Sequence, residues 1–472
     1  MKKETAKYIT TTLPYVNADP HIGFAFEILV ADAVARSWRL ANHEVFFTTG
    51  TDEHGQKIAE KADAEGKTRQ AYVDHFANEF KKLGEALDLS YDNFIRTTDR
   101  HHERAAEEMW NRCLASGDIY KKKYQGLYCV GDEAFLKETD LVDGRCPNHP
   151  NLIPQEVEEE NYFFALSKYQ NYLQDYLSTS GVIEPNWRRL EALKFVENGL
   201  EDFSISREKS RLDWGIPVPN DDTQVMYVWF DALTNYISTL GWPETAGDFE
   251  KFWQQGEVVQ LAGKDQVRFQ SIMWQAMLKS AGLKATDKVV YHGFITSGGQ
   301  KMSKSLGNTI NPYDLVNRYG TEATRYLLLR HVHPFDDSDI TIERCDELYT
   351  AGLVNGLGNL TARIMKMSET HLDGGYTELP EYLNIENYNL QSALDTIWQG
   401  IQKLDERITE TEPFKLVKTD PETAKDIIFD LRKQLVGIGY ALAPFMPQTS
   451  KIIVEAVATN TKPDNLFARL DV

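Results

Sequence analysis

The sequence predicts an α/β protein in which a parallel, Rossmann-like sheet is split by an inserted knob and followed by an α-helical bundle. Apolar strand-like runs alternate with helical stretches at the start of the chain and again after residue 224, which is the pattern of a parallel sheet. Turn-rich sequence between these two regions indicates the insertion. From Leu348 onward, helical periodicity with long polar faces predicts a helical domain, broken at GLGN, LDGG and PFMP.

The first half opens with a strand, a loop and a helix. An apolar run from Tyr8 to Leu13 predicts the strand, a proline-containing loop follows, and the run from Ile22 to Leu40 predicts the helix. A second strand, EVFFTTG, ends in the polar loop TDEHGQK before another helical stretch. This is the βαβ order of a parallel sheet, whose ligand-binding loops lie at the strand ends.

The insertion is marked by the pairs CVGD and CPNH and by the acidic run EVEEEN. After it the βαβ order resumes with QVMYVWFDA and EVVQLAGKD, a helix around FQSIMWQAMLKSAG and the strand DKVVYHGFITS. We therefore expect the boundaries 1–116, 117–223, 224–330, 331–355 and 356–472.

The composition excludes several classes of protein. At 472 residues, 42% hydrophobic and 26% charged, the chain lies near the globular average and is not mainly disordered or collagen-like. Its net charge of −20 disfavours binding of polyanions over the whole surface, although a local basic groove remains compatible with it. No apolar run reaches the about 18 residues of a membrane span, and no signal peptide is visible, so we expect a cytoplasmic protein without membrane contact.

Two motifs indicate phosphate chemistry. His21 and Gly23 lie where the first strand gives way to its helix, and there backbone N–H groups and an imidazole can hold an anion. A histidine that merely caps the helix fits the same pattern. The string KMSKS, from Lys301 to Ser305, has glycines on both sides, so its two lysines can follow charge onto a leaving pyrophosphate. A solvated basic turn is the alternative for this string.

HIGF and KMSKS together resemble the two signatures of class I aminoacyl-tRNA synthetases. Further segments, in the same order along nearly the whole chain, narrow the resemblance to the methionyl-tRNA synthetases: LPYVNADPHIG, FFTTGTDEHGQKIAEKA, DWGIPVP, YVWFDALTNYIS, LAGKDQVRF and HGFITSGGQKMSKSLGN. The resemblance implies a ligase that activates methionine with ATP and Mg²⁺ to methionyl-adenylate. It would then charge the 3′ end of initiator and elongator methionine tRNA, as a monomer.

The resemblance also assigns roles to the expected regions. Residues 1–116 and 224–330 would be the halves of the catalytic domain, and 117–223 a connective insertion. At about a hundred residues this insertion is too short for the editing domain that related enzymes use against substrates differing by a methyl group. The stretch 331–355 would be a stem-contact linker, and 356–472 the anticodon-binding domain.

The resemblance implies a methionine site and an ATP site. Asp52 would pair with the substrate ammonium, with the cap of a helix as its alternative role. The methionine side chain would be walled by Leu13, Tyr15, Trp229, Ala232, Tyr236 and Phe269, of which the aromatics would otherwise be ordinary core. The ATP-binding set would be His21, Gly23, Gly263, Asp265, His292, Gly293 and Lys304, and the catalytic set His21, Lys301 and Lys304.

Two further sites lie outside the catalytic halves. Cys129, Asp132, Cys146 and His149 have the spacing of a zinc knuckle, with Asp132 where the family often has cysteine, and either bound Zn²⁺ or a metal-free knob fits them. Asn359 and Arg363 match the anticodon-contacting pair of the family, and their spacing puts both on one helix face. A solvated helix face is the alternative, and no stacking aromatic is evident, since Tyr440 is only nearby.

The chain departs from the family at two positions. Phe24 replaces the second histidine of the HIGH signature, and Gln270 stands where the family usually has histidine. These departures keep open a slow paralogue that binds tRNA or methionine as a regulator. A small-molecule nucleotidylyltransferase is the more distant alternative, which the long helical domain disfavours.

Overall fold

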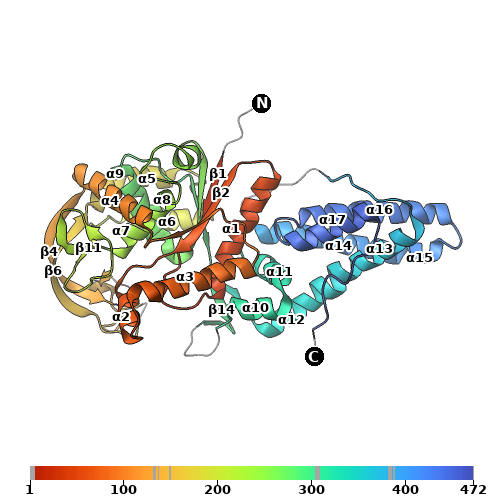
Figure 1. The fold of residues 1–472 in the computed structure, drawn as a ribbon, viewed down its shortest axis with the longest axis horizontal. Helices are drawn as coiled ribbons and strands as arrows, with labels where there is room; N and C mark the ends of the chain where they lie inside the picture. Colours follow the sequence, from red (N-terminus) through yellow and green to blue (C-terminus); the bar gives the residue numbers. More distant parts are fainter. Residues whose placement is uncertain are drawn as a thin grey trace. The chain divides into compact units, whose positions relative to one another are not determined.

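The computed structural model describes residues 6–130, 134–136, 138–147, 150–302, 309–380, 385 and 388–470 (Figure 1). The chain forms two compact units that alternate along the sequence. The first unit comprises Met1–Asp19, Phe46–Lys82 and Tyr91–Tyr291, and the second comprises Pro20–Val45, Leu83–Ser90 and His292–Val472.

The first unit is built on a six-stranded sheet in the order β3-β2-β1-β12-β13-β7. The pairs β2–β3, β1–β12 and β13–β7 are parallel, and strands from both halves of the sequence share the sheet, so the predicted divided α/β fold is confirmed. The strands are β1 (Lys7–Thr10), β2 (Val45–Thr51), β3 (Asn93–Arg96), β7 (Ile183–Glu184), β12 (Glu257–Gly263) and β13 (Lys288–His292).

Local sequence explains the central strands. Val258 to Gly263 in β12 are all buried, as a parallel strand covered on both faces requires. Gly50 in β2 permits a close approach to β3, because a Cβ at this position would lie only 1.9 Å from the carbonyl oxygen of Ile95.

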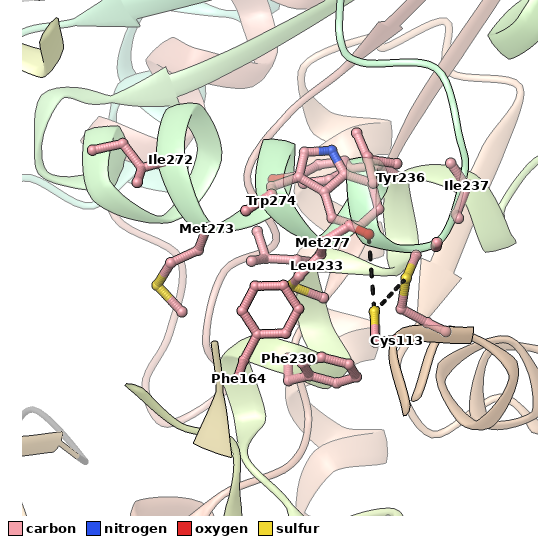
Figure 2. Close-up of a cluster of buried hydrophobic side chains, with 14 of the residues drawn as sticks. Cys113, Phe164, Phe230, Leu233, Tyr236, Ile237, Ile272, Met273, Trp274 and Met277 are labelled. Carbon is pink, nitrogen blue, oxygen red and sulfur yellow. Dashed lines mark hydrogen bonds between the residues drawn. The ribbon is translucent and has the colours of Figure 1, made fainter. Parts of the chain in front are cut away.

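The helices of the first unit enclose a large apolar core. Figure 2 shows part of it, where Phe230 and Leu233 lie close to Trp274, Met277 and Phe164. The α-helices are α2 (Gln56–Ala64), α3 (Arg69–Ala86, whose last turn belongs to the second unit), α4 (Arg100–Ala115), α5 (Gln170–Ser178), α6 (Asn186–Glu197), α7 (Val228–Leu233), α8 (Asn235–Ser238) and α9 (Trp274–Ser280). Shorter or wider helical segments are η1 (Glu138–Asp140), η2 (Leu166–Tyr169), η3 (Phe249–Gln254), η4 (Lys264–Gln266) and η5 (Phe269–Met273).

The inserted region contains two small antiparallel sheets, ordered β5-β4-β6-β8 and β10-β11-β9. The expectation that QVM resumes the parallel sheet is wrong, because these residues end β11. A two-residue connection with Asn220 at φ +64° joins β10 to β11, and such a hairpin links only antiparallel strands. The strands are β4 (Ile119–Cys129), β5 (Ala134–Leu136), β6 (Gln155–Phe164), β8 (Phe203–Ser204), β9 (Ser206–Glu208), β10 (Pro217–Val218) and β11 (Asp221–Met226).

The second unit is mainly helical, and the predicted C-terminal helical region is confirmed. Figure 1 shows α14, α16 and α17 running side by side. The helices are α1 (Ile22–Leu40), α10 (Pro312–Tyr319), α11 (Thr321–His331), α12 (Ile342–Tyr349), the π-helical η7 (Thr350–Gly358), α13 (Asn359–His371), α14 (Leu390–Thr411), α15 (Pro413–Leu416), α16 (Pro421–Ala441) and α17 (Pro447–Thr459). A small sheet, β15-β14-β16, is formed by β14 (Ile295–Ser297), β15 (Gln300–Lys301) and β16 (Ser338–Asp339).

Side-chain caps define the starts of several of these helices. Asn311, Thr341, Asn389 and Asp420 each accept a hydrogen bond from a backbone N–H in the first turn. The predicted breaks at LDGG and PFMP are confirmed, but the break at GLGN is wrong. There η7 runs directly into α13, and Gly358 avoids a Cβ that would lie 3.0 Å from the carbonyl oxygen of Leu353. Among the described residues, no helix is long and apolar enough to cross a membrane.

The buried guanidinium of Arg325 joins four segments of the second unit. It donates to the Asp32 carboxylate at 2.7 Å and to the carbonyl oxygens of Leu87 (3.0 Å), Pro444 (3.0 Å) and Phe445 (2.7 Å). Burial alone would raise the pKa of Asp32, but Arg325 with Arg36 and Ser90 holds that pKa below its usual range. The charge is therefore paired, and each guanidinium nitrogen donates at least one hydrogen bond where solvent cannot reach it.

We predict that Arg325→Ala lowers the free energy of unfolding by about 3–5 kcal/mol, because Asp32 then stays buried without its main partner. The matched control is Arg344→Ala, which breaks the solvent-exposed pair with Glu347 on α12 and should cost about 0–1 kcal/mol. Urea unfolding followed by helical circular dichroism measures both variants. Equal losses would contradict this account of Arg325.

Candidate active site

The loop after β1 is joined to the end of β2 in the first unit. Tyr15 and Asp52 form a parallel bridge, in which the Asp52 N–H donates to the Pro14 carbonyl at 3.0 Å and the Val16 N–H donates to the Asp52 carbonyl at 3.1 Å. The side chains of Leu13 and Asp52 are buried, and Tyr15 is half-buried. The structure thus brings together three of the residues predicted to bind methionine.

Aromatic rings from α7 and η5 face each other in the same unit. Trp229 and Phe269 stack with their centroids 3.8 Å apart and an interplanar angle of 11°. Both rings are half-buried, whereas Tyr236 on α8 is 2% exposed. The predicted wall residue Ala232 lies on α7, one turn after Trp229.

Gln270 connects Tyr236 to the loop that follows β1. Its Nε2 donates to the Tyr236 hydroxyl at 2.8 Å and to Thr12 Oγ1 at 3.3 Å, and its side chain is 1% exposed. Tyr236 is held from a second direction as well, because the Tyr8 hydroxyl donates to its carbonyl oxygen at 2.8 Å. The amide of Gln270 therefore supplies a hydrogen-bond donor at a position where the family usually has an imidazole.

Two buried side chains of the polar loop TDEHG, those of Glu53 and His54, hold the loop in place through contacts with other segments. Glu53 is fully buried and accepts two hydrogen bonds from Arg96, at 2.7 and 2.9 Å, while His54 contacts Asp231 at 2.8 Å. The N-cap position of the next helix, α2, is occupied by Gly55 and not by Asp52. Asp52 is instead a buried carboxylate at a strand end.

The residues predicted to bind ATP are divided between the two units. In the first unit, Gly263 ends β12, and the exposed Asp265 lies in the following helical turn. In the second unit, His21 caps α1, with its Nδ1 accepting from the Phe24 N–H at 3.3 Å. Gly23 leaves space for this ring, because a Cβ there would lie 3.1 Å from it.

The cap determines the tautomer of His21. Since Nδ1 accepts a hydrogen bond, the proton of the neutral ring resides on Nε2, which is then a donor. The capping role and the predicted phosphate role of His21 are therefore compatible, because they use different ring nitrogens.

His292, the last residue of β13, and Gly293, the residue after it, belong to the second unit. The ring nitrogens of His292 are 2.8 Å from the Gly293 carbonyl oxygen and 2.9 Å from Glu27 Oε2, and the ring meets Phe26 edge to face. Gly293 has no room for a side chain, since a Cβ would lie 2.2 Å from the backbone of Asp336. Lys301 is the last residue of β15, and Lys304 lies outside the described residues.

The described part of the knob contains two of the four predicted zinc ligands. Cys129 ends β4 and Cys146 lies between η1 and β6, and both thiols are buried. Asp132 and His149 lie outside the described residues. Within the described residues no group of three or more His, Cys, Asp or Glu side chains is arranged to hold a metal ion.

The predicted anticodon pair lies at the start of α13. Asn359 is its first residue, and Arg363 forms an ion pair with Asp405 of α14. A cavity of about 510 Å³ lies beside it, lined by Asn355, Leu360, Trp398, Asp405 and Glu406 among others.

Two exposed aromatic side chains of the second unit are candidates for the stacking aromatic that the sequence did not identify. Phe414 on α15 is 46% exposed and Phe429 on α16 is 42% exposed. The helix start EPFK was the available signal for Phe414, because it places a phenyl ring beside a lysine on a short polar helix.

Comparisons with known proteins cover most of the chain. The family model described as tRNA synthetases class I (M) matches residues 7–151 and 151–365. The methionine–tRNA ligase of Fusobacterium nucleatum is 38% identical over 97% of this chain and 76% of its own length, and that of Brucella suis is 38% identical over 96% and 91%. A solved structure of Mycobacterium tuberculosis methionyl-tRNA synthetase in complex with methionyl-adenylate matches with a TM-score of 0.90 at 35% identity, covering 96% of this chain and 93% of that one.

Phe24, the other departure from the family, is 7% exposed on α1. An imidazole buried here needs hydrogen-bond partners that a phenyl ring does not, and leaving them unmade costs about 1–3 kcal/mol. We predict that Phe24→His lowers the free energy of unfolding by about this amount and does not raise the rate of amino-acid activation in single turnovers. Phe24→Leu is the apolar control. A faster Phe24→His enzyme of unchanged stability would show that the phenyl ring has displaced a useful donor.

Proposed function

The chain belongs to the class I methionyl-tRNA synthetases, and from this premise we propose which of its residues carry out each step of the reaction. The enzyme activates L-methionine with ATP to methionyl-adenylate and transfers the methionyl group to the 3′ end of methionine tRNA. The observation that carries the assignment of the methionine site is the half-buried Trp229–Phe269 stack in the same unit as the Tyr15–Asp52 bridge.

Methionine is recognised at its two ends. The carboxylate of Asp52 binds the substrate ammonium, a charge-assisted pairing that is strong in a buried setting. Trp229, Phe269 and Tyr236 contact the thioether side chain, because sulfur packs favourably against aromatic edges and the unbranched chain adapts to the space between them. Leu13, Tyr15 and Ala232 complete this wall.

Adenylate formation requires that negative charge be stabilised as it moves. A methionine carboxylate oxygen attacks the α-phosphorus, the bond from that phosphorus to the bridging oxygen breaks, and pyrophosphate leaves with the electron pair. His21 donates from Nε2 to the α-phosphate, and Lys301 and Lys304 follow the charge onto pyrophosphate. Mg²⁺ on the phosphates supplies further neutralisation when bound.

The nucleoside part of ATP is bound by two pairs of residues. Asp265, with Gly263 before it, accepts from the ribose hydroxyls, since an exposed carboxylate at a strand end is suited to this contact. His292 and Gly293 form the edge beside adenine.

The helical region recognises the tRNA. Asn359 and Arg363 contact the anticodon of initiator and elongator methionine tRNAs, with Phe414 or Phe429 as the stacking ring. The enzyme works as a monomer in the cytoplasm. The relatives and the solved structure named above are ligases, and they give no support to the alternative of a binding regulator.

The proposed methionine site is tested by ATP–pyrophosphate exchange with different amino acids. We predict exchange driven by methionine, and kcat/KM values lower by a factor of about 10 to 200 for leucine, isoleucine and valine, because the wall fits an unbranched thioether. Trp229→Ala should raise the KM for methionine more than the KM for ATP. Exchange driven equally by leucine and methionine would rule out this assignment of the pocket.

We also propose that Cys129, Asp132, Cys146 and His149 hold one Zn²⁺ in the knob. The two buried thiols fit the donor set of a zinc site, whereas the Asp132 carboxylate is a harder ligand than thiolate. We predict about one equivalent of zinc in protein purified without chelator, its loss to chelators, and tighter retention in Asp132→Cys. Metal analysis that finds less than about a tenth of an equivalent in both forms would show a metal-free knob.

A further inference from the structure

In the first unit, the buried carboxylate of Asp231 contacts the rings of two histidines. Asp231 Oδ2 lies 2.8 Å from His54 Nδ1, and Asp231 Oδ1 lies 2.9 Å from His102 Nε2. The other ring nitrogen of His102, Nδ1, lies 2.9 Å from Ser238 Oγ. All four side chains are at most 5% exposed. This group, here called the Asp231 network, belongs to none of the sites predicted from the sequence.

The Asp231 network joins the elements that carry the proposed methionine site. His54 follows Asp52 by two residues, and Asp231 lies on α7 between Trp229 and Ala232. Ser238 lies on α8, two residues after Tyr236. His102 lies on α4, which bears no residue of the proposed site.

Helix α7 is short and depends on its anchors. It has only 6 residues, so tertiary contacts rather than helix propensity must hold it. On its apolar side, Phe230 and Leu233 pack into the core cluster drawn in Figure 2. Its polar anchor is Asp231, whose two imidazole contacts fix the rotation of the helix and hence the place of Trp229.

We propose that Asp231 is a positioning residue for methionine, which acts through His54 to hold the Asp52 loop at a fixed distance from the wall on α7. The ammonium and the thioether of one methionine molecule would reach Asp52 and Trp229 at the same time only at that spacing. This inference rests on the proposed function, because it assumes that Asp52 and Trp229 bind methionine.

The charges in the Asp231 network support this role. Burial would lower the pKa of His54, but Asp231, with smaller contributions from Glu53 and Glu103, raises it above its ordinary value. Burial would likewise raise the pKa of Asp231, but His54 and His102 hold it below its usual range. Trp214 meets the His54 ring edge to face at 5.5 Å and adds no charge.

The ion pair between His54 and Asp231 determines whether the KM for methionine rises or falls with pH. The imidazolium of His54 is fully present below the ordinary histidine pKa and is lost as pH rises through the raised pKa in the folded protein. Above that pH the buried Asp231 carboxylate is no longer neutralised by His54. The KM for methionine should therefore rise with pH across this range.

The direct test is Asp231→Asn in ATP–pyrophosphate exchange. The asparagine amide has the shape of the carboxylate but only one acceptor oxygen and no charge, so it cannot accept hydrogen bonds from both imidazoles. We expect the KM for methionine to rise about tenfold or more, while the KM for ATP stays within about twofold of wild type. The matched control is Asp118→Asn, which alters another buried carboxylate of the first unit, held by Ser280 and Lys168, and should lower stability without changing the KM for methionine.

Substitutions of His54 separate positioning from a merely structural role. His54→Asn keeps an N–H donor near the place of Nδ1 but carries no charge, so its KM for methionine should equal the high-pH value of wild type at every pH and lose the rise with pH. His54→Leu should resemble Asp231→Asn. An unchanged KM for methionine in Asp231→Asn, an equal rise in the KM for ATP, or a pH profile of His54→Asn like that of wild type would overturn the inference. Absence of methionine-dependent exchange in the wild-type enzyme would overturn the proposed function instead.

Discussion

The pairing of β1 with β12 is the constraint on which the first unit depends. It joins two parts of the sequence separated by the whole insertion, with Lys7 opposite Glu257 and Thr10 opposite Gln260. Polar contacts extend the pairing past the strand ends, since Gln270 donates to Thr12 and the Thr11 hydroxyl contacts that of Thr49 on β2. The residues proposed to bind methionine in the β1 and β2 loops and on η5 owe their proximity to these contacts.

The same unit keeps its polar loops rigid by burying charges in pairs. Glu53, paired with Arg96, and His54, paired with Asp231, directly follow Asp52 in the chain, so the loop carrying the proposed ammonium ligand has little freedom. A buried ion pair adds little net stability compared with apolar packing, but separating the partners leaves a buried charge uncompensated. In the second unit, the Asp32–Arg325 pair holds the helix that begins beside His21 in a comparable way.

Periodicity and motifs were sufficient to predict the α/β fold, the family and the helix Ile22–Leu40. They failed where tertiary contacts override the local pattern. QVM belongs to a hairpin strand because the chain turns at Asn220. GLGN is helical because its two glycines lie within η7. The Asp231 network was not predictable by spacing, since His54, His102 and Asp231 lie far apart in the chain. The only signal was a charged residue within apolar strings such as VWFDAL. The site residues themselves stay predictions.

The central claim is that Asp52 and the Trp229–Phe269 pair bind the two ends of one methionine molecule. A crystal structure of the protein with a non-hydrolysable methionyl-adenylate analogue tests it most directly. The account predicts the ligand ammonium at about 2.7–2.9 Å from the Asp52 carboxylate and the thioether in contact with the Trp229 and Tyr236 rings. A ligand whose ammonium binds another carboxylate, or whose side chain lies away from these rings, would contradict it.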